Sequence, residues 1–392
     1  MPNNIYFGRE TKVILQQGIY QWEIPILNGF NFSQSANISE VMLAEMSNNA
    51  GVSRRGSASF TDSQAPAEWS FETYIRPTIA SSKSVSPEDA LWANFIAANA
   101  WTGTAWAANT LTSTATTATG EFTNSNKVSL GEFTLWFITG AVNSTTTGTT
   151  QYSNTGTATA TLSVGHSIMK IAKCVVNEVS INYDIDGIAT LSWSGFGSTL
   201  TAETSTGVFP SVPIKSGINN TNNFVRNRVT QMDLFSRATP GGAAVTTYSA
   251  LTLTGGSLTI SNNITYLTPE VLGVVNRPIG HVTGGRSVKG SFTTYLDLTN
   301  DSSEELFTEL TSGASNGLRN YYDIKLYIGG KNTASPLLPT APGLAIAMPN
   351  CHLSIPTFDN GDIVSLSVDF TAVPTDMGAT DEISSFVYAG IA

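Results

Sequence analysis

Three histidines and two cysteines are the side chains in this sequence best suited to catalysis or metal binding. His166, His281 and His352 each stand without a carboxylate or a second histidine at the spacing of metal ligands. Cys351 and His352 are adjacent, like a nucleophile and its base, but neighbouring residues of a strand point to opposite faces, so neither can orient the other. We therefore expect neither a catalytic dyad nor a metal site at these residues.

Two other groups of residues are similar to ligand-binding loops. Segment 282–287, VTGGRS, is rich in glycine, but it lacks the GxxxxGK[ST] spacing and no helix follows it immediately, so we interpret it as a flexible loop. Asp184 with Asp186, and Asp359 with Asp362, could mimic calcium ligands, but these loops are too short for a cage and aspartate is common in hairpin turns. With no nucleophile beside a base, no metal cluster and no cofactor motif, the sequence predicts a protein that is not an enzyme and binds no cofactor.

The composition is typical of a folded β protein with polar loops. Hydrophobic residues make up 41% of the 392 residues and aromatic residues 9%, too many for an intrinsically disordered chain. The formal net charge is −10, which disfavours an extended grip on nucleic acid because phosphate binding needs clustered lysine and arginine. Cys174 and Cys351 form no CxxC motif, so they predict neither a disulfide framework nor a zinc site, and they leave a single disulfide between them open.

The first residues, MPNNIYFGRETKVILQQ, contain no basic segment leading into an apolar core, so we expect no signal peptide. No apolar run approaches the length of about 18 residues that a membrane-spanning helix needs. These features favour a protein of the cytoplasm, or of a particle assembled there.

Five sequence blocks occur twice in the same order. They are 29–33 with 257–261, 69–76 with 290–297, a helix at 86–99 with one at 301–313, 132–140 with 321–329, and 177–194 with 350–369. In the last pair, Ser180-Ile181 corresponds to Ser354-Ile355. We interpret the pattern as a duplicated domain, residues 1–215 and 216–392, in which the first copy carries Thr-rich insertions at about 102–126 and 143–161 that we expect on the outer surface.

Local signals indicate the elements within each copy. Segments 69–76 and 290–297 alternate as strands do, and Asp186-Gly187 and Asn360-Gly361 mark hairpin turns. Ser86 is a predicted N-cap with Pro87 at the first helical position, and Ser302 with Glu305 forms a predicted capping box. The expected fold is mainly β, with two tandem β-sandwich or barrel domains that each carry one short α-helix.

The order of strand, long loop, strand, capped helix, strand and closing hairpin resembles that of the tail tube proteins of long-tailed bacteriophages. The ending 355–376, IPTFDNGDIVSLSVDFTAVPTD, is similar to the final hairpin and trailing segment of that family. The resemblance implies a structural protein of the virion tail, assembled in the host cytoplasm, whose inner sheets join around rings. Such rings stack into the hollow tube through which DNA is ejected.

Rings of this family usually contain six single-domain subunits, so two copies per chain imply a homotrimer with pseudo-sixfold symmetry. About four inner strands per copy give about 24 per ring, more than the 16–18 that already leave an aqueous channel. The partners that the resemblance implies are further copies of the chain, a tape-measure protein, tail-end proteins, and DNA in transit without specific binding.

The loops before the matched strands, 47–69 and 276–290, contain cations in a chain that has few charges. These are Arg54, Arg55, Arg277, Arg286 and Lys289. In tail tubes the corresponding loop reaches the adjacent ring, which implies that these cations pair with acidic groups across the stack. The alternative is a solvated basic loop, since exposed ion pairs contribute only about 0–1 kcal/mol each.

Five aspartates lie in or near the predicted hairpins: Asp184, Asp186, Asp359, Asp362 and Asp369. A conduit must let a polyanion pass, so we predict an acidic or neutral lumen to which these residues contribute. Asp184 and Asp186 share a face if their strand stays regular up to the turn. The alternative is that all five solvate turns and the outer surface.

A competing function is that of a secreted tandem β-sandwich adhesin or carbohydrate-binding protein. Trp101 and Trp106 could form its aromatic platform. The missing signal peptide argues against this alternative.

Overall fold

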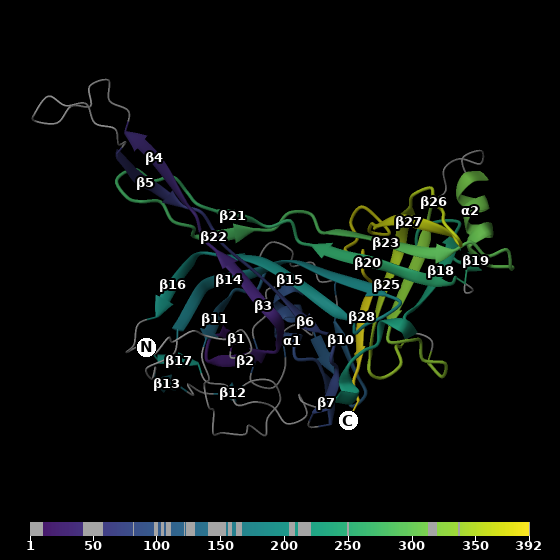
Figure 1. The fold of residues 1–392 in the computed structure, drawn as a ribbon, viewed down its shortest axis with the longest axis horizontal. Coiled ribbons are helices and arrows are strands. Elements are labelled where there is room, and N and C mark those ends of the chain that lie inside the picture. Colours follow the sequence, from purple (N-terminus) through teal and green to yellow (C-terminus); the bar gives the residue numbers. More distant parts are fainter. Residues whose placement is uncertain are drawn as a thin grey trace, which may run out of the picture.

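A computed structural model gives the fold (Figure 1). The structure describes residues 11–41, 58–80, 82–97, 101–102, 106, 111–120, 122, 130–139, 154–155, 159–161, 167–203, 208–210, 221–248, 251–312, 320–335 and 338–391. Within these ranges strands dominate, and the α-helices are α1 (Asp89–Ile96) and α2 (Ser303–Ser312). The predicted mainly-β fold class is confirmed.

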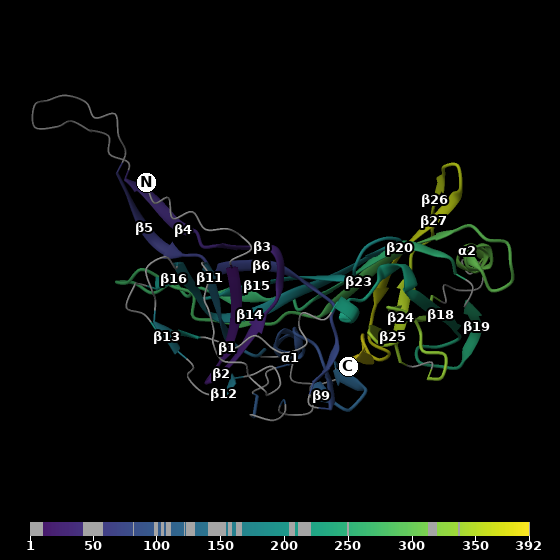
Figure 2. The same ribbon diagram turned by 60° about the horizontal axis from the view of Figure 1, so that its bottom comes forward.

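One long antiparallel sheet passes through both halves of the chain (Figures 1 and 2). In spatial order its strands are β3 (Ile26–Ser33), β6 (Ala67–Tyr74), β15 (Thr190–Gly197), the C-terminal part of β14 (Ser167–Asp184), β20 (Leu253–Ser261), β23 (Ser287–Tyr295), β27 (Val364–Ala372) and β26 (Thr357–Asn360). β14 and β20 pair from Glu178 opposite Ser261 to Asp184 opposite Gly255. The sheet therefore continues from the first half of the chain into the second.

A second group of strands in each half shares the hydrophobic core with this sheet. In the first half they are β2 (Tyr20–Ile24), β1 (Thr11–Gln17), β11 (Phe133–Thr139), the N-terminal part of β14, and β16 (Thr199–Glu203). In the second half they are β19 (Ala244–Tyr248), β18 (Gln231–Arg237), β24 (Tyr322–Ile328), β25 (Gly343–Leu353) and β28 (Ser385–Ala389).

The order of strand pairing is the same in the two halves. The first half pairs β2–β1–β11–β14–β15–β6–β3. The second pairs β19–β18–β24–β25–β27–β23–β20, with β26 extending the contact of β25 with β27. Each strand of one series thus has a counterpart in the other.

The remaining strands form short hairpins and additions. They are β4 (Ala36–Val41) with β5 (Ala58–Gln64), β7 (Thr78–Ala80) with β8 (Lys83–Val85), β9 (Leu111–Ser113) with β10 (Thr117–Gly120), β12 (Asn154–Thr155) with β2, β13 (Thr159–Thr161) with β17 (Val208–Pro210), and β21 (Thr265–Leu267) with β22 (Gly280–Val282). Short 3-10 helices, η3 (Thr221–Asn223) and η4 (Asn227–Val229), follow the first half.

The first Thr-rich insertion is not only surface decoration, contrary to expectation. Its strand β10 pairs with β28 of the second half from Thr117 opposite Ala389 to Gly120 opposite Phe386, and Ala118 is fully buried. The insertion contributes an internal strand because β28 arrives from the far end of the chain, which sequence spacing does not reveal.

Helix α1 packs against side chains of both halves of the chain. Every residue of Asp89–Ile96 is buried. The Trp92 ring lies 4.9 Å from Trp193 and 4.3 Å from Phe386, and its Nε1 donates a hydrogen bond of 2.8 Å to the Tyr388 hydroxyl. Since Phe386 and Tyr388 belong to β28, the second half completes the core of the first.

The helix termini differ in detail from the predicted caps. α1 begins at Asp89, with Glu88 rather than Ser86 at the N-cap, and the Asp89 amide donates to the Ser86 carbonyl in a preceding turn. At α2 the Glu305 carboxylate accepts from the Asp301 amide, one residue before the expected partner. Of the glycines in the two predicted hairpin turns, Gly187 takes a positive φ, +96°, between β14 and β15, whereas Gly361 between β26 and β27 does not.

Candidate functional site

The long sheet has one buried face and one polar face, because successive side chains of a strand alternate. The buried face carries large apolar side chains, among them Phe71, Ile181, Trp193, Leu258 and Phe292. The polar face is paved with hydroxyl groups that bond across strands: Ser180 with Thr259 at 3.0 Å and Ser257 with Ser291 at 3.1 Å. This face is the candidate functional surface.

The charges on the polar face are unequal in sign. Following the strand register, the face carries the carboxylates of Glu68, Glu72, Glu178, Asp184, Asp359 and Asp369. Among the described strands of the sheet, the polar face carries one basic side chain, that of Lys289 in β23. The Ser192 hydroxyl donates a hydrogen bond of 3.2 Å to the Glu72 carboxylate and so stabilises its negative charge. Six acidic groups against one basic group make the surface repulsive to a polyanion.

The predicted acidic residues divide between this face and the turns at its rim. Asp184, Asp359 and Asp369 lie on the polar face. Asp186 lies in the turn that follows β14, exposed and 3.9 Å from Arg228, and so does not continue the face of Asp184. Asp362 lies exposed in the turn between β26 and β27.

Three further carboxylates of this face, Glu68, Glu72 and Glu178, were missing from the sequence-based candidates. Their signal was present in the sequence, because Glu68 and Glu72 alternate with Trp69 and Phe71. The sequence alone did not show the strand pairing, in which β15 lies between β6 and β14 and brings their carboxylates onto one face.

The predicted cations lie in different environments. Arg54 and Arg55 fall outside the described residues. Lys289 belongs to a strand and lies on the polar face, whereas Arg277 is exposed in the loop between β21 and β22.

Arg286 is enclosed within its own chain. Its side chain is 3% exposed, donates to the Phe122 carbonyl at 3.0 Å and lies 3.9 Å from the Glu382 carboxylate. Burial lowers the pKa of Arg286, and the charge of Glu382 opposes that effect. These contacts join the residue before β23 to Phe122 of the first half and to the segment before β28, so Arg286 has an intramolecular role.

The two outer strands of the sheet, β3 and β26, are edges. Within the described residues β3 pairs with β6 and β26 with β27, each on one side alone. All four residues of β26 are exposed. Such an edge presents free N–H and C=O groups to any strand that can pair with it.

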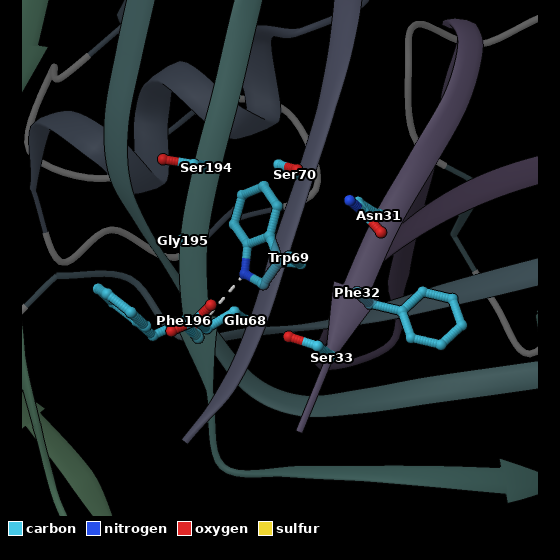
Figure 3. A pocket seen from close by; sticks show the side chains of 9 residues that line it. All are labelled: Asn31, Phe32, Ser33, Glu68, Trp69, Ser70, Ser194, Gly195 and Phe196. Atoms are coloured by element: carbon cyan, nitrogen blue, oxygen red, sulfur yellow. Dashed lines mark hydrogen bonds between the residues drawn. The ribbon is translucent and has the colours of Figure 1, made fainter. Parts of the chain in front are cut away.

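A shallow hollow marks the β3 edge (Figure 3). It has a volume of about 350 Å³ and is lined by residues of β3, β6 and β15. The indole Nε1 of Trp69 donates to the Phe196 carbonyl at 3.3 Å, while Glu68 is the one ionisable side chain of the lining. These lining residues contain no pair suited to nucleophilic catalysis.

The histidines and cysteines considered first lie elsewhere. Cys174 and Cys351 are buried free thiols, so no disulfide joins them, and burial raises the pKa of both. His281 lies 3.4 Å from Glu132, but burial lowers its pKa, and its Nε2 accepts from the Leu130 amide. His166 falls outside the described residues. Within the described part of the chain no three His, Cys, Asp or Glu side chains cluster as metal ligands, and no helix is long and apolar enough to cross a membrane.

Trp101 and Trp106, the proposed aromatic platform, pack on Trp22. Their ring centroids lie 6.2 Å and 5.4 Å from the Trp22 ring, and Trp106 is buried. Since this aromatic cluster belongs to the core, it does not favour a carbohydrate-binding function.

Comparison with known proteins identifies similar sequences. A family model described as "Phage tail tube protein" matches residues 51–372. The chain is also 29% identical over 371 residues to the tail tube protein pb6 of Escherichia phage T5, an alignment that covers 92% of this chain and 69% of that protein.

Proposed function

Because this chain belongs to the phage tail tube protein family, it is a structural component of the virion tail that assembles into the tube, and we propose that three copies close each ring through their sheet edges. The observation that carries this proposal is a long sheet whose outer strands, β3 and β26, each pair on one side alone within the part of the chain that the structure describes. Edge strands of this kind are satisfied when a ring closes.

The proposal treats the chain as two tandem tube domains, residues 1–215 and 216–392. The repeated order of strand pairing supports this division. Between the two domains, β14 of the first pairs with β20 of the second. The counterpart of β14 at the far edge is β26, and the counterpart of β20 at the near edge is β3. The free edges of neighbouring chains are thus equivalent to the two strands already joined within one chain.

The register of the joint between chains follows from the joint within the chain. Asn182 pairs with Ser257 across β14 and β20. Asn182 pairs with Thr190, which in turn pairs with Tyr74. Asp359 pairs with Ser365, which pairs with Tyr295, the counterpart of Tyr74, so Asp359 occupies the place of Asn182. Asn31 occupies the place of Ser257, because Asn31 follows the residue that pairs with Phe71 and Ser257 follows the residue that pairs with Phe292. In spatial order, Asp359 of one chain therefore faces Asn31 of the next.

Eight strands per chain give about 24 strands in a trimeric ring, enough for an aqueous channel. We assign the polar face to the lumen because the other face is filled by the core. The excess of carboxylates repels the phosphates of DNA, and the neutral hydroxyl groups do not attract them. DNA in transit can therefore pass along this face without specific binding. The tape-measure and tail-end proteins are the further partners of this proposal, which includes no catalytic role.

Engineered disulfides test the ring. The double variant Asn31→Cys/Asp359→Cys brings two thiols to paired positions whose Cα atoms are about 4.5–5.5 Å apart, within disulfide range. The native thiols are buried and do not interfere. Mild oxidation of assembled protein should give covalent trimers in denaturing electrophoresis, and tubes reconstructed by electron microscopy should show three chains per ring.

The matched control is Asn31→Cys/Asp369→Cys, in which the second thiol stays on the same face but lies one strand inside the edge. It should remain monomeric in the same assay. Covalent hexamers would overturn the trimer, and tubes without cross-links in the first variant would overturn the pairing of β26 with β3.

A further inference from the structure

The joint within the chain and the joint between chains carry the same pair of hydroxyl groups. Within the chain, Ser180 of β14 is paired with Thr259 of β20, and their hydroxyl oxygens lie 3.0 Å apart. In the register proposed for the joint between chains, Thr357 of β26 takes the place of Ser180, and Ser33 of β3 takes that of Thr259. The hydroxyl pair thus recurs with serine and threonine exchanged, which supports this register by residue type.

A tyrosine fills one position of the joint within the chain. Tyr183 of β14 is directly opposite Gly256 of β20, and it is 4% exposed on the buried face. Its hydroxyl donates to the Ser291 carbonyl of β23 at 3.1 Å, so the ring reaches across β20. A Cβ atom on Gly256 would lie 2.5 Å from the Cζ atom of this ring. The tyrosine therefore occupies the space that a side chain at position 256 would need.

The outer edges carry the opposite combination of sizes. Phe30 of β3 takes the place of Gly256, since each is opposite a phenylalanine of the neighbouring strand. Asn360 of β26 takes the place of Tyr183, one residue beyond the aspartate that takes the place of Asn182. The large side chain thus lies on β3 and the small one on β26, whereas within the chain the large one lies on β14 and β20 has glycine.

We propose that this exchange of sizes determines which strands join, an inference that rests on the proposed ring. If β3 of a second copy replaced β20 on β14, Phe30 would meet Tyr183, and two rings would compete for one space. If β20 of a second copy joined β26, Gly256 would face Asn360 and leave a void. The β26 edge therefore selects the first half of a second copy, through β3, and rejects its second half.

Side-chain size has to provide this selection because the backbone does not. The two halves share one order of strand pairing, so each edge has two strands of similar shape that could join it. The Phe30 ring lies 4.8 Å from Phe137 and 5.7 Å from Phe32, and these contacts hold it against the core of its own chain. Asn360 is exposed at the last position of β26. The fit between the two edges is therefore set mainly by the residue at position 360.

A substitution at this position tests the fit. In the Asn31→Cys/Asp359→Cys background, Asn360→Tyr places a second ring opposite Phe30, and covalent trimers should fall about tenfold or more because the joint becomes overpacked. The control is Met377→Tyr, which adds the same ring to a residue that is 102% exposed in the turn before β28 and should leave the yield of trimers unchanged. Equal yields of trimers from the two variants would overturn the inference.

A compensating substitution identifies the residue that Asn360 faces. Adding Phe30→Gly to Asn360→Tyr recreates the tyrosine–glycine pair of the joint within the chain and should restore most of the trimers. Phe32→Gly is the matched control, because the Phe32 ring packs on the same Phe137 ring, at 4.9 Å, but lies two residues along β3. It should restore none, and restoration by both glycines alike would contradict the assigned pair.

A second cross-link reports the rejected joint without any change to the core. Asn31→Cys/Asn182→Cys places thiols where β3 of one copy would meet β14 of another, and it should give no covalent oligomers under the conditions that cross-link Asn31→Cys/Asp359→Cys. Similar yields from both pairs of thiols would show that β3 does not discriminate and would refute the selection. Absence of covalent trimers with Asn31→Cys/Asp359→Cys would instead refute the proposed ring itself.

Discussion

Replacing Glu88 by glutamine should stabilise the folded chain at neutral and alkaline pH. Glu88 is fully buried at the start of α1, and its Oε1 accepts a hydrogen bond of 3.3 Å from the Tyr388 hydroxyl of β28. Burial raises the pKa of Glu88 to about 7, against smaller opposing effects of hydrogen bonds from Ser86 and Tyr388 and of the Arg76 charge. The carboxyl thus lies where the two halves of the chain meet.

The sign and size of the effect follow from the two pKa values. Between 4.5, the ordinary value, and about 7, the folded chain holds a proton that the unfolded chain releases, so stability falls as pH rises through this range. The difference corresponds to about 3 kcal/mol of unfolding free energy, lost in full above pH 7, since one pKa unit equals about 1.4 kcal/mol. Glutamine has no proton to lose and its amide oxygen can still accept from Tyr388.

Denaturant unfolding of the subunit at pH 4.5 and pH 8 measures the effect. Glu88→Gln should match the original chain at the lower pH and exceed it by up to about 3 kcal/mol at the higher pH. Glu72→Gln, a substitution on the polar face where the side chain is exposed, is the control and should keep the pH dependence of the original chain. An unchanged pH dependence in Glu88→Gln would refute the assignment.

Two further predictions concern the lumen and the sheet. The triple variant Glu72→Lys/Glu178→Lys/Asp369→Lys should bind duplex DNA as an unassembled subunit, with affinity falling roughly 40-fold between about 50 and 200 mM salt for three phosphate contacts. Fluorescence anisotropy checks this, and tight salt-sensitive binding by the original chain would contradict the acidic lumen. Gly195→Ala should lose about 3 kcal/mol of unfolding free energy in denaturant unfolding, because its new methyl group would lie 2.1 Å from the Val175 carbonyl oxygen. Gly285→Ala meets open space and should change the unfolding free energy little.

Several features were predictable from the sequence because they depend on neighbours along the chain. Alternation in 69–76 and 290–297 predicted β6 and β23, and the capping residues that follow each segment predicted α1 and α2. Hairpin dipeptides at 186–187 and 360–361 fell at the observed turns. The alternating polar positions already contained the acidic face, even where the sequence-based list omitted Glu68, Glu72 and Glu178.

Registers between strands needed the tertiary structure. Sequence matching placed Ile355 at the position of Ile181, but Phe358 is the residue opposite Leu366, as Ile181 is opposite Leu191. The reason is the turn: three residues separate Asn360 from Val364, whereas seven separate Asn182 from Thr190. Turn length fixes where pairing resumes, and similarity of the flanking strands cannot report it.

Long-range packing decided the rest. The local sequence predicted that Arg286 lies in a loop, but the fold buries its side chain against Phe122 and Glu382. These two residues are 164 and 96 residues away along the chain. In the same way β28 enters the first half beside β10 because the core around Trp92 requires its aromatic side chains. Residue types and their alternation determined the strands and the polar face of this protein. Which strands became free edges, and which charges stayed exposed, depended on contacts between distant segments that only the folded chain brings together.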